Sequence, residues 1–463
     1  MTMQAWMAEG PRWPSRTLRA AVAAIPMLLV ACDGVGDGRS ASPSPDAPSA
    51  PLEPPAPVEN RARALVETSL RLDLAAQRGE AVVSIAASQQ PGVSFDVGAL
   101  EIHSVTSALG TLRFRQQDGQ LDIGLPSSDG PLDIVIDYRF AAQDDFNGWM
   151  PEPGVSFLWP DFCGNLFPCR DEPAAGQRYR LTVSGVPEGN TAVYPQRIPA
   201  AAPAYMPAVA LGDYRVLSLG TTRDGTEVKL WHLPGEAEHA VDGTQYLAQS
   251  MDFFEQTYGP YAFGDVVGSV SVRWGPGRFG GMEHHPFWHV ASEAMGSPEI
   301  HAHEAAHGWF GNGVRMACWE DFALSEGTAS YLAARALDQQ GIDLWPEYEC
   351  RLQRVCTDER VNTVARPSDC NAIRLRDHPL WSDVPYMKGA QFLRQVAERV
   401  GANAVDDALA RFYRERFGTE ARMQDLVDHL RAAFPSESLG IEALAQGWLY
   451  QRACPSVPDR VCR

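Results

Sequence analysis

Basic residues are scarce in this chain. Its 463 residues include 39 Lys and Arg against 58 Asp and Glu, which leaves a formal net charge of −19. A protein with this surplus of negative charge is repelled by phosphate backbones and by anionic lipid headgroups. The composition therefore argues against nucleic acid and an anionic membrane surface as partners, whereas neutral or cationic peptides are compatible with it.

The N-terminal region also lacks an apolar run long enough to cross a membrane. The run Ala20–Ala31 follows three arginines and has about twelve residues, whereas a spanning helix needs roughly 20. It ends in Leu-Val-Ala-Cys at residues 29–32, which resembles a bacterial lipoprotein processing box. We expect residues 1–31 to be a signal peptide, whose removal leaves a lipidated Cys32 as membrane anchor. A plain secretory signal, with Cys32 in a disulfide, is the alternative.

The segment after the signal is too poor in core-forming residues to fold by itself. Residues 32–58 are rich in Pro, Ser, Gly and Ala, which predicts an extended tether. Asp33 directly follows the anchor cysteine, and in enterobacterial sorting this favours the inner membrane. We therefore expect a bacterial cell-envelope protein that is lipid-anchored and faces the periplasm.

Eight cysteines remain once Cys32 is set aside. An even number fits disulfides formed in an oxidising compartment. Many pairings are possible, and the pairs closest in sequence, 163 with 169 and 454 with 462, are the natural candidates. The eight are Cys163, Cys169, Cys318, Cys350, Cys356, Cys370, Cys454 and Cys462.

The rest of the chain, about 400 residues, is too long for a single core and divides by its pattern. Residues 59–234 contain short runs of alternating polarity, which predict an antiparallel β-domain. Examples are Ala81–Ala87, Leu132–Phe140 and Tyr179–Val183. Residues 235–463 are dominated by helical runs. They include Val241–Tyr258, Glu299–Gly311, Asp321–Gln339, Lys388–Val400 and Ala402–Phe417. The predicted fold class is α+β.

The sequence His-Glu-Ala-Ala-His at residues 303–307 predicts a metal site. His303 and His307 are four residues apart, so on a helix both imidazoles lie on one face. Glu326 follows after eighteen intervening residues, in a second predicted helix. Imidazole nitrogens and a carboxylate oxygen suit Zn²⁺, and three protein ligands leave a fourth position for water. We expect one catalytic zinc ion per chain.

Glu304 lies between the two histidines and is the candidate base. A carboxylate in this place can take a proton from the attacking water and later pass it to a leaving amine, which predicts hydrolysis of an amide. The five-residue pattern by itself also occurs by chance in helices that bind nothing. The third ligand at the right distance makes the catalytic interpretation the stronger one.

Other potential ligands surround the motif in sequence. His284, His285, His289 and His301 raise the possibility of a second metal, but their spacing does not place them on one face, and we expect packing or pocket roles. Cys318 would close the zinc site as a fourth ligand, so we expect a disulfide or a buried thiol instead.

Residues 303–312 and 319–327 together resemble the active-site segments of the aminopeptidase N family of zinc metallopeptidases. The resemblance implies a thermolysin-like catalytic domain behind an N-terminal β-domain, with zinc as cofactor and peptides as substrates. Residues 167–173 also resemble a conserved turn of that family's β-domain. The chain stops soon after residues 447–451, which resemble the end of the family's catalytic domain, so the resemblance implies a form without the large C-terminal helical domain.

The resemblance assigns further site residues. Gly281, Met282 and Glu283 match the substrate-binding signature, in which the glutamate contacts the free α-amino group of the peptide. Tyr386 matches the tyrosine whose hydroxyl steadies the oxyanion opposite the zinc.

Two positions depart from the family pattern. His284 stands where the signature has asparagine, and Trp159 stands where members carry a glutamine or glutamate that shares the α-amino group. Amine recognition then rests on Glu283 alone or on another residue such as Asp161.

The predicted function is that of a zinc aminopeptidase acting on peptides. Two alternatives stay open: a metallopeptidase with relaxed or endopeptidase specificity, favoured by Trp159 and His284, and a peptide-binding lipoprotein scaffold without activity. The presence of all three ligands with Glu304 and Tyr386 argues against the scaffold.

Overall fold

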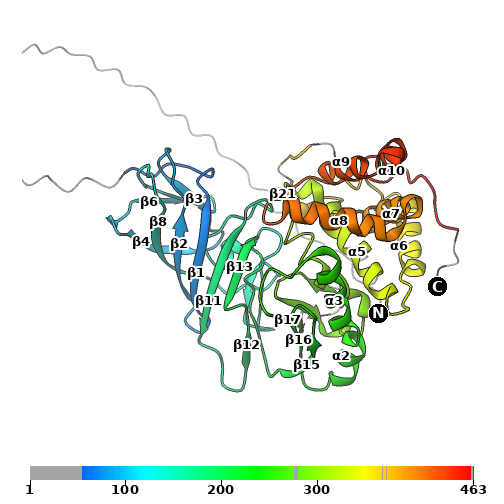
Figure 1. Ribbon diagram of the computed structural model, residues 1–463. Helices are drawn as coiled ribbons and strands as arrows, with labels where there is room; N and C mark the ends of the chain where they lie inside the picture. The colour runs from blue at the N-terminus through cyan, green and yellow to red at the C-terminus, as the bar shows by residue number, and fades with distance from the viewer. Residues whose placement is uncertain (1–54, 276–279, 368, 372, 460–461, 463) are drawn as a thin grey trace, which may run out of the picture.

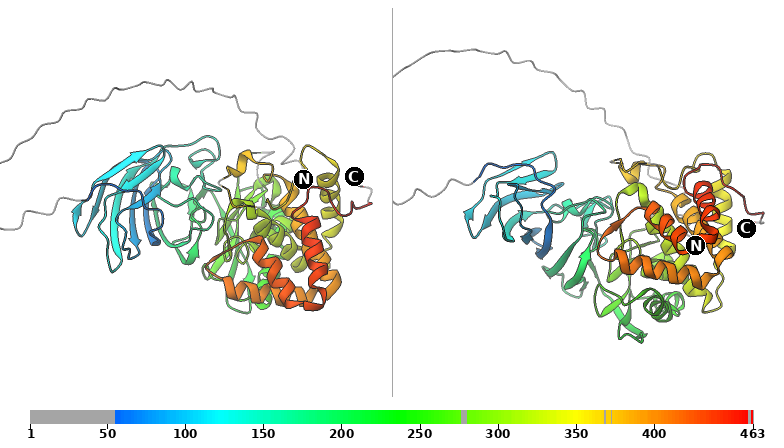
Figure 2. Two further views of the ribbon diagram at one scale, coloured as in Figure 1. Left: turned by 90° about the horizontal axis from the view of Figure 1, so that it is seen from above. Right: turned by 45° about the horizontal axis from the view of Figure 1, so that its top comes forward.

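The computed structural model describes residues 55–275, 280–367, 369–371, 373–459 and 462. Strands fill the N-terminal half and helices the C-terminal half, as Figure 1 shows, which confirms the predicted α+β class. The views in Figure 2 agree that the blue and cyan strands and the orange and red helices lie at opposite ends of the molecule. The predicted signal peptide, Cys32 and most of the predicted tether lie outside the described residues.

A seven-stranded sheet forms the centre of the N-terminal half. Its strands are, in spatial order, β13 (Arg197–Ala202), β11 (Gln177–Ser184), β1 (Leu65–Asp73), β2 (Arg78–Ile85), β8 (Leu132–Arg139), β4 (Glu101–Ser107) and β5 (Gly110–Thr111). Alternation decides which face is buried, since Ala81, Val83 and Ile85 on β2 are fully buried while the residues between them are partly exposed. Pairing is antiparallel as predicted, except that β1 and β11 run parallel.

Two smaller sheets accompany it. One contains β3 (Val93–Asp96), β7 (Gln120–Ile123) and β6 (Phe114–Gln117). The other contains β12 (Thr191–Val193), β14 (Ala210–Gly212), β10 (Val155–Phe157) and β9 (Gly148–Met150).

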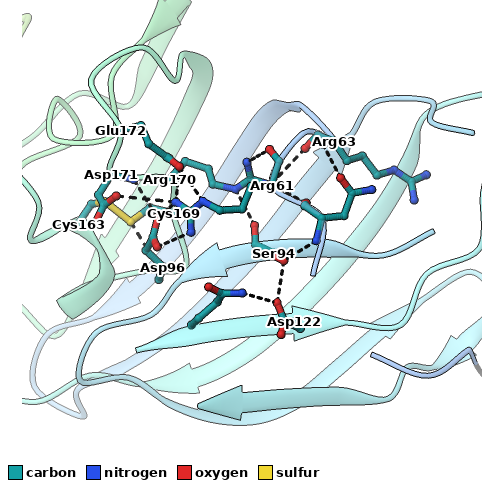
Figure 3. A network of polar contacts seen from close by, with 12 residues as sticks. Arg61, Arg63, Ser94, Asp96, Asp122, Cys163, Cys169, Arg170, Asp171 and Glu172 are labelled. Atoms are coloured by element: carbon teal, nitrogen blue, oxygen red, sulfur yellow. Dashed lines mark hydrogen bonds and ion pairs between the residues drawn. A yellow bond between two sulfur atoms is a disulfide. The ribbon is translucent and has the colours of Figure 1, made fainter. Parts of the chain in front are cut away.

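The segment that resembles a family turn, residues 167–173, ties these layers together through Arg170. Figure 3 shows the buried Arg170 guanidinium, whose Nε donates to the Ser94 carbonyl oxygen at 2.6 Å. Beside it, Arg61 donates two hydrogen bonds of 2.8 Å to the Asp96 carboxylate, and its Nε donates to Glu172 at 2.7 Å. Charged groups from three chain segments therefore meet at one point of the β-rich half.

A five-stranded sheet begins the part that carries the candidate site. Its order is β15 (Arg215–Thr221), β16 (Glu227–His232), β17 (Val266–Val272), β19 (Phe287–Ala291) and β18 (Gly281–Met282). Strands β16, β17 and β19 are parallel, and the edge strands β15 and β18 are antiparallel to their neighbours. The sheet starts at Arg215, before the domain boundary at residue 234 that the sequence predicts, and thus crosses that boundary.

Most of the helices follow the sheet, while α2 and α3 lie in the chain between β16 and β17. The helices are α2 (Ala237–Thr244), α3 (Leu247–Tyr258), α4 (Pro298–Ala306), α5 (Phe322–Asp338), α6 (Trp345–Thr357), α7 (Asp383–Val400), α8 (Ala402–Arg416), α9 (Met423–Ala433) and α10 (Ser438–Trp448). Three predicted bounds were wrong. The single helix expected over residues 241–258 is two helices, α4 ends at Ala306 rather than Gly311, and α7 begins at Asp383 rather than Lys388.

Helices α5 and α7 cross where each has a glycine. A Cβ atom added to Gly327 would lie 2.6 Å from the Cα of Gly389, so neither position has room for a side chain. The close crossing brings the helix that carries Glu326 against the helix that carries Tyr386.

Four disulfides join the eight remaining cysteines. The expected pair Cys163–Cys169 is present, but the expected pair of Cys454 with Cys462 is wrong. Both of these residues pair with α6 instead, as Cys356–Cys454 and Cys350–Cys462. The fourth disulfide joins Cys318 to Cys370. Proximity in sequence was a poor guide here because the segment that follows α10 lies against α6, which comes much earlier in the chain.

None of the helices in the described part of the chain is both long and apolar enough to cross a membrane.

Candidate active site

Helix α4 holds the first two candidate ligands in the interior. Ser297 caps it by accepting a hydrogen bond from the Ile300 N–H at 3.4 Å, and Pro298 occupies its first position. His303 lies inside the helix, while His307 follows its last residue but keeps helical angles of φ −59° and ψ −19°. His303 and His307 therefore still lie on the same face, although the helix ends earlier than predicted. Both histidines are buried.

Glu326, from α5, completes a triangle with the two imidazoles. Its Oε2 lies 3.1 Å from His303 Nε2 and 3.4 Å from His307 Nε2, and the two Nε2 atoms are 3.1 Å apart. A tetrahedral ion with arms of 2.0–2.1 Å requires ligand atoms roughly 3.3 Å apart. The observed edges match this requirement, so the predicted set of zinc ligands is brought together.

The hydrogen bonds behind the triangle orient the imidazoles for metal binding. His307 Nδ1 lies 3.0 Å from the Phe310 carbonyl oxygen and 3.2 Å from Ser325 Oγ, and His303 Nδ1 lies 3.4 Å from Ser330 Oγ. An Nδ1–H that donates to a carbonyl leaves the Nε2 lone pair free for a cation. These partners were missed by the sequence-based prediction, although Ser325 directly precedes Glu326.

The donor set fits zinc in charge as well as in shape. Burial works against ionisation of Glu326, yet the neighbouring His307 and His303 lower its pKa to about 2, so the carboxylate is a ready anionic ligand. Cys318 is held in its disulfide with Cys370, which agrees with the expectation that it does not close the site. Two nitrogens and one oxygen are the ligand set of many catalytic zinc sites.

Two further carboxylates face the triangle. Polar atoms of Glu283, Glu304 and His307 all lie within 4.8 Å of one another. Glu304 Oε2 and Glu283 Oε1 are buried, and neither has a hydrogen-bond partner among the residues that the structure describes. Burying a carboxylate oxygen without a hydrogen-bond partner costs free energy. Both oxygens are therefore available to a substrate or to water.

Burial shifts the protonation of both acids. It raises the pKa of Glu283 to about 7, with His307 opposing and Glu326 reinforcing the rise. It raises the pKa of Glu304 well above the usual value, again with His307 opposing and Glu283 reinforcing. A carboxylate with a raised pKa is a stronger base when it is ionised, as a general base needs to be.

The substrate signature lies against this pair of acids. Gly281 and Met282 form β18 at the edge of the five-stranded sheet. A Cβ atom on Gly281 would lie 2.3 Å from Glu304 Oε1, so only glycine lets the strand approach the base. The Asn312 side-chain amide donates to the Glu283 carbonyl oxygen at 3.0 Å and fixes the end of the signature.

Tyr386, from α7, reaches the same site. Its ring stacks on that of His303, and it contacts the Phe322 ring edge-on. Burial, together with the charges of Glu326, Glu283 and Glu304, raises the pKa of Tyr386 well above its usual value. The hydroxyl is therefore protonated and able to donate.

The remaining histidines of the cluster do not converge on the triangle. His301 binds Ser269 Oγ and the Met295 carbonyl, each at 2.8 Å. His285 lies between the Tyr261 hydroxyl at 2.8 Å and the Glu304 carbonyl at 2.7 Å. His284 and His289 face each other, with their Nδ1 atoms 3.2 Å apart. Among the described residues these contacts favour packing roles, as expected.

Trp159 fills the place next to Glu283. Its ring is 1% exposed and lies 4.8 Å from the ring of Trp381 and 5.8 Å from that of Phe322. The Trp159 N–H is close enough to help lower the pKa of Glu283, although no well-formed hydrogen bond joins them. Asp161 is the alternative amine anchor. Burial raises its pKa, and the nearby Arg374 and Arg376 only partly oppose this rise.

Comparison with known proteins places these features in context. The sequence profile described as "Peptidase family M1 domain" matches residues 289–448. The matched residues include the zinc triangle, Glu304 and Tyr386, and they begin after Glu283.

Characterised relatives are distant in sequence. Aminopeptidase M1 of Arabidopsis thaliana is 23% identical over 375 residues, which are 74% of this chain and 41% of the plant protein. Aminopeptidase B of Mus musculus is 26% identical over 309 residues, which are 60% of this chain and 46% of the mouse protein. The chain thus spans about half the length of the curated relatives that it matches.

Solved structures match over more of the chain. An M1 zinc metallopeptidase from Deinococcus radiodurans superposes with a TM-score of 0.71 at 19% identity, covering 87% of this chain and 97% of that one. A mutant of the same enzyme, bound to the substrate Tyr-Ser-Ala, has a TM-score of 0.72 at 18% identity and covers 86% and 96%. At these identities the likeness establishes a shared fold.

Proposed function

The chain belongs to peptidase family M1, and on this basis we propose that it is a zinc-dependent aminopeptidase, which removes the N-terminal residue from peptides. One observation carries the proposal. The Glu283 carboxylate, whose Oε1 has no hydrogen-bond partner among the described residues, lies within 4.8 Å of Glu304 and His307, so an anchor for an ammonium group stands about one residue away from the candidate base.

Each site residue has a distinct task in this proposal. His303, His307 and Glu326 hold Zn²⁺, which when bound supplies a Lewis acid that polarises the peptide carbonyl and acidifies water. Glu304 takes the proton of the attacking water and later delivers it to the leaving amine. Tyr386 donates its hydroxyl to the oxygen on which negative charge develops.

Substrate binding rests on β18 and Glu283. A peptide backbone in extended form pairs with the edge strand Gly281–Met282, where strand addition is favourable. The α-ammonium group binds the Glu283 carboxylate, which fixes the scissile bond next to Glu304. Charge supports this choice of substrate, because a chain with a net charge of −19 attracts cationic peptides and does not repel neutral ones.

A peptidase that also cuts internal bonds is the second candidate, and Trp159 favours it. The indole N–H next to Glu283 is a donor, so it cannot accept a hydrogen bond from a substrate ammonium group. Recognition of a free N-terminus then rests on the Glu283 carboxylate.

The location of the enzyme is part of the proposal. We infer export, lipid attachment through Cys32 and a position on the periplasmic face of a bacterial membrane, with Asp33 favouring the inner one. The support is the N-terminal sequence together with four disulfides, which persist in oxidising compartments.

A paired peptide library tests the function. Zinc-loaded protein is incubated with peptides that are each present with a free and with an acetylated N-terminus, and products are identified by mass spectrometry. Stepwise shortening of only the free peptides is the expected result. Internal cuts in both forms would establish the second candidate, and intact peptides throughout would contradict both.

A further inference from the structure

Arg351 is a fully buried charged residue that joins two helices of the site. It lies on α6 and is 1% exposed. Its Nη1 donates to Glu299 Oε1 at 2.9 Å, and its Nη2 donates to Asp383 Oδ1 at 2.8 Å. One guanidinium therefore links α4, which carries His303 and is followed directly by His307, with α7, which carries Tyr386.

The two carboxylates occupy matching places on their helices. Glu299 lies in the first turn of α4, four residues before His303. Asp383 lies in the first turn of α7, three residues before Tyr386. Residues three or four apart share a helix face, so each carboxylate lies one turn below a functional side chain. The ion pairs of Arg351 therefore hold each helix one turn before its active-site side chain.

Arg351 keeps its charge in this interior position. Burial lowers its pKa, but the charges of Asp383 and Glu299 outweigh burial and leave the pKa raised. The guanidinium is a planar fork with fixed donor directions, so two charge-assisted bonds define both distance and orientation. A lysine in the same place would bring a single point charge without that geometry.

The helix that carries Arg351 is itself held in place. Cys350, its direct neighbour, is bonded to Cys462, and Cys356 on the same helix is bonded to Cys454. The Arg351 guanidinium carbon also lies 5.7 Å from the centre of the Tyr348 ring. Because α6 is held by two disulfides, Arg351 has a fixed position from which it can set the positions of α4 and α7.

We propose that Arg351 is a positioning residue for peptide hydrolysis, which holds Tyr386 at the correct distance from the zinc triangle. The inference rests on the proposed function. Tyr386 makes ring contacts with His303 and Phe322, and such contacts tolerate sliding, whereas the ion pairs at the start of α7 do not. A displacement of about 1 Å of a group aligned with the reacting atoms can cost about a hundredfold in rate.

The test is a double-mutant cycle of Arg351→Met and Tyr386→Phe. We expect Arg351→Met alone to lower kcat by about ten- to a hundredfold, with KM and zinc content unchanged. In the Tyr386→Phe background the same change should lower kcat by less than about threefold, because the group that it misplaces is already gone. Equal losses in the two backgrounds, or a loss of zinc that accounts for the lost activity, would overturn the positioning role.

Arg394→Met is the matched control. Arg394 on α7 donates to Glu349 Oε1 on α6 at 2.9 Å, so this pair joins the same two helices at a place remote from Tyr386. We expect kcat to be unchanged. A loss as large as that of Arg351→Met would show that any link between α6 and α7 suffices, and would also overturn the inference.

Two milder variants keep the test decisive if Arg351→Met does not fold. Arg351→Lys retains the charge but bridges poorly, and Asp383→Asn removes one ion pair. Both should lower kcat with zinc retained and show the same dependence on Tyr386. Wild-type protein that cleaves none of the library peptides would contradict the proposed function, whereas an active wild type with additive variants would contradict the role of Arg351 alone.

Discussion

The ring of Tyr386 lies over the ring of His303, with centroids 5.7 Å apart and an interplanar angle of 23°. A side chain from α7 thus covers a zinc ligand from α4 and faces the same space as Glu304 and Glu283. The close crossing of α5 and α7 at Gly327 and Gly389 makes this approach possible. In the proposed mechanism, Tyr386 donates its hydroxyl to the oxygen on which negative charge develops during hydrolysis.

Replacement of Tyr386 by Phe is expected to lower kcat by about a hundredfold while zinc is retained, because the ring stays and the donor is lost. Steady-state kinetics and elemental analysis check both parts. Tyr331→Phe is the control. That tyrosine is buried on α5, and its hydroxyl has no partner in the described part of the chain. An unchanged kcat in Tyr386→Phe would remove the tyrosine from the mechanism.

Glu304→Gln should reduce kcat by about 10²- to 10⁴-fold, because an amide cannot take the proton of the attacking water. Zinc content should be preserved, since Glu304 is not part of the triangle. Glu320→Gln makes the same change at another buried glutamate and should leave kcat near the wild-type value. Equal activity of Glu304→Gln and wild type would contradict the assignment as a metallopeptidase.

Glu326→Ala is expected to lose zinc, because two imidazoles hold the ion poorly without the carboxylate. Elemental analysis after dialysis against a weak chelator measures this directly. Glu304→Gln, treated in the same way, serves as the reference that keeps its metal. Full zinc occupancy in Glu326→Ala would mean that another residue supplies the third ligand.

Trp159→Gln should lower KM for peptides with a free N-terminus by about tenfold, because the amide oxygen adds an acceptor for the ammonium group next to Glu283. Trp159→Phe keeps an aromatic ring against Trp381 but removes the indole N–H, and it should not produce this gain. The comparison uses free and acetylated forms of one peptide. A gain that is equal for both forms would show that the change acts on packing rather than on amine recognition.

Asp171 is expected to make the folded protein less stable as the pH rises. Burial and the neighbouring Asp96 and Glu172 raise its pKa to about 8, against roughly 4 in an unfolded chain. Between these values the folded state binds the proton more tightly, so this contribution to stability is complete below about pH 4 and is lost as the pH rises through about 8.

Asp171→Asn, in the network of Figure 3, tests this effect because the amide does not ionise. Thermal unfolding should show a higher Tm than wild type at pH 9 and a smaller difference at pH 5. A Tm difference that is the same at both pH values would contradict a titration of Asp171.

The zinc triangle was predictable because its information is local. His303 and His307 are one helical turn apart, and Glu326 follows at a fixed distance, so short-range spacing determines which side chains meet. The alternating β-pattern and the helical runs were predictable for the same reason. Bounds were less certain, as the early end of α4 shows, because His307 keeps helical angles after the hydrogen-bonded helix has stopped.

Contacts between segments that are distant in the sequence could not be predicted from the sequence pattern. Arg351 meets Glu299 and Asp383 only because three helices converge, and an arginine in a helical run carries no sign of its partners. The disulfides of α6 were missed on the same grounds, since cysteines near one another in sequence were taken as pairs. The parallel contact of β1 and β11 also depends on the path of the chain rather than on pattern.

The two disulfides of α6 have a consequence for how the protein is made. Their partners lie 98 and 112 residues further along the chain, beyond every zinc ligand and beyond Tyr386. A nascent chain that has left the ribosome up to Trp448 therefore contains the complete set of reacting groups while α6, which carries Arg351, still lacks both covalent ties. Translation thus delivers every reacting group of the proposed site before it delivers the two cysteines that tie α6.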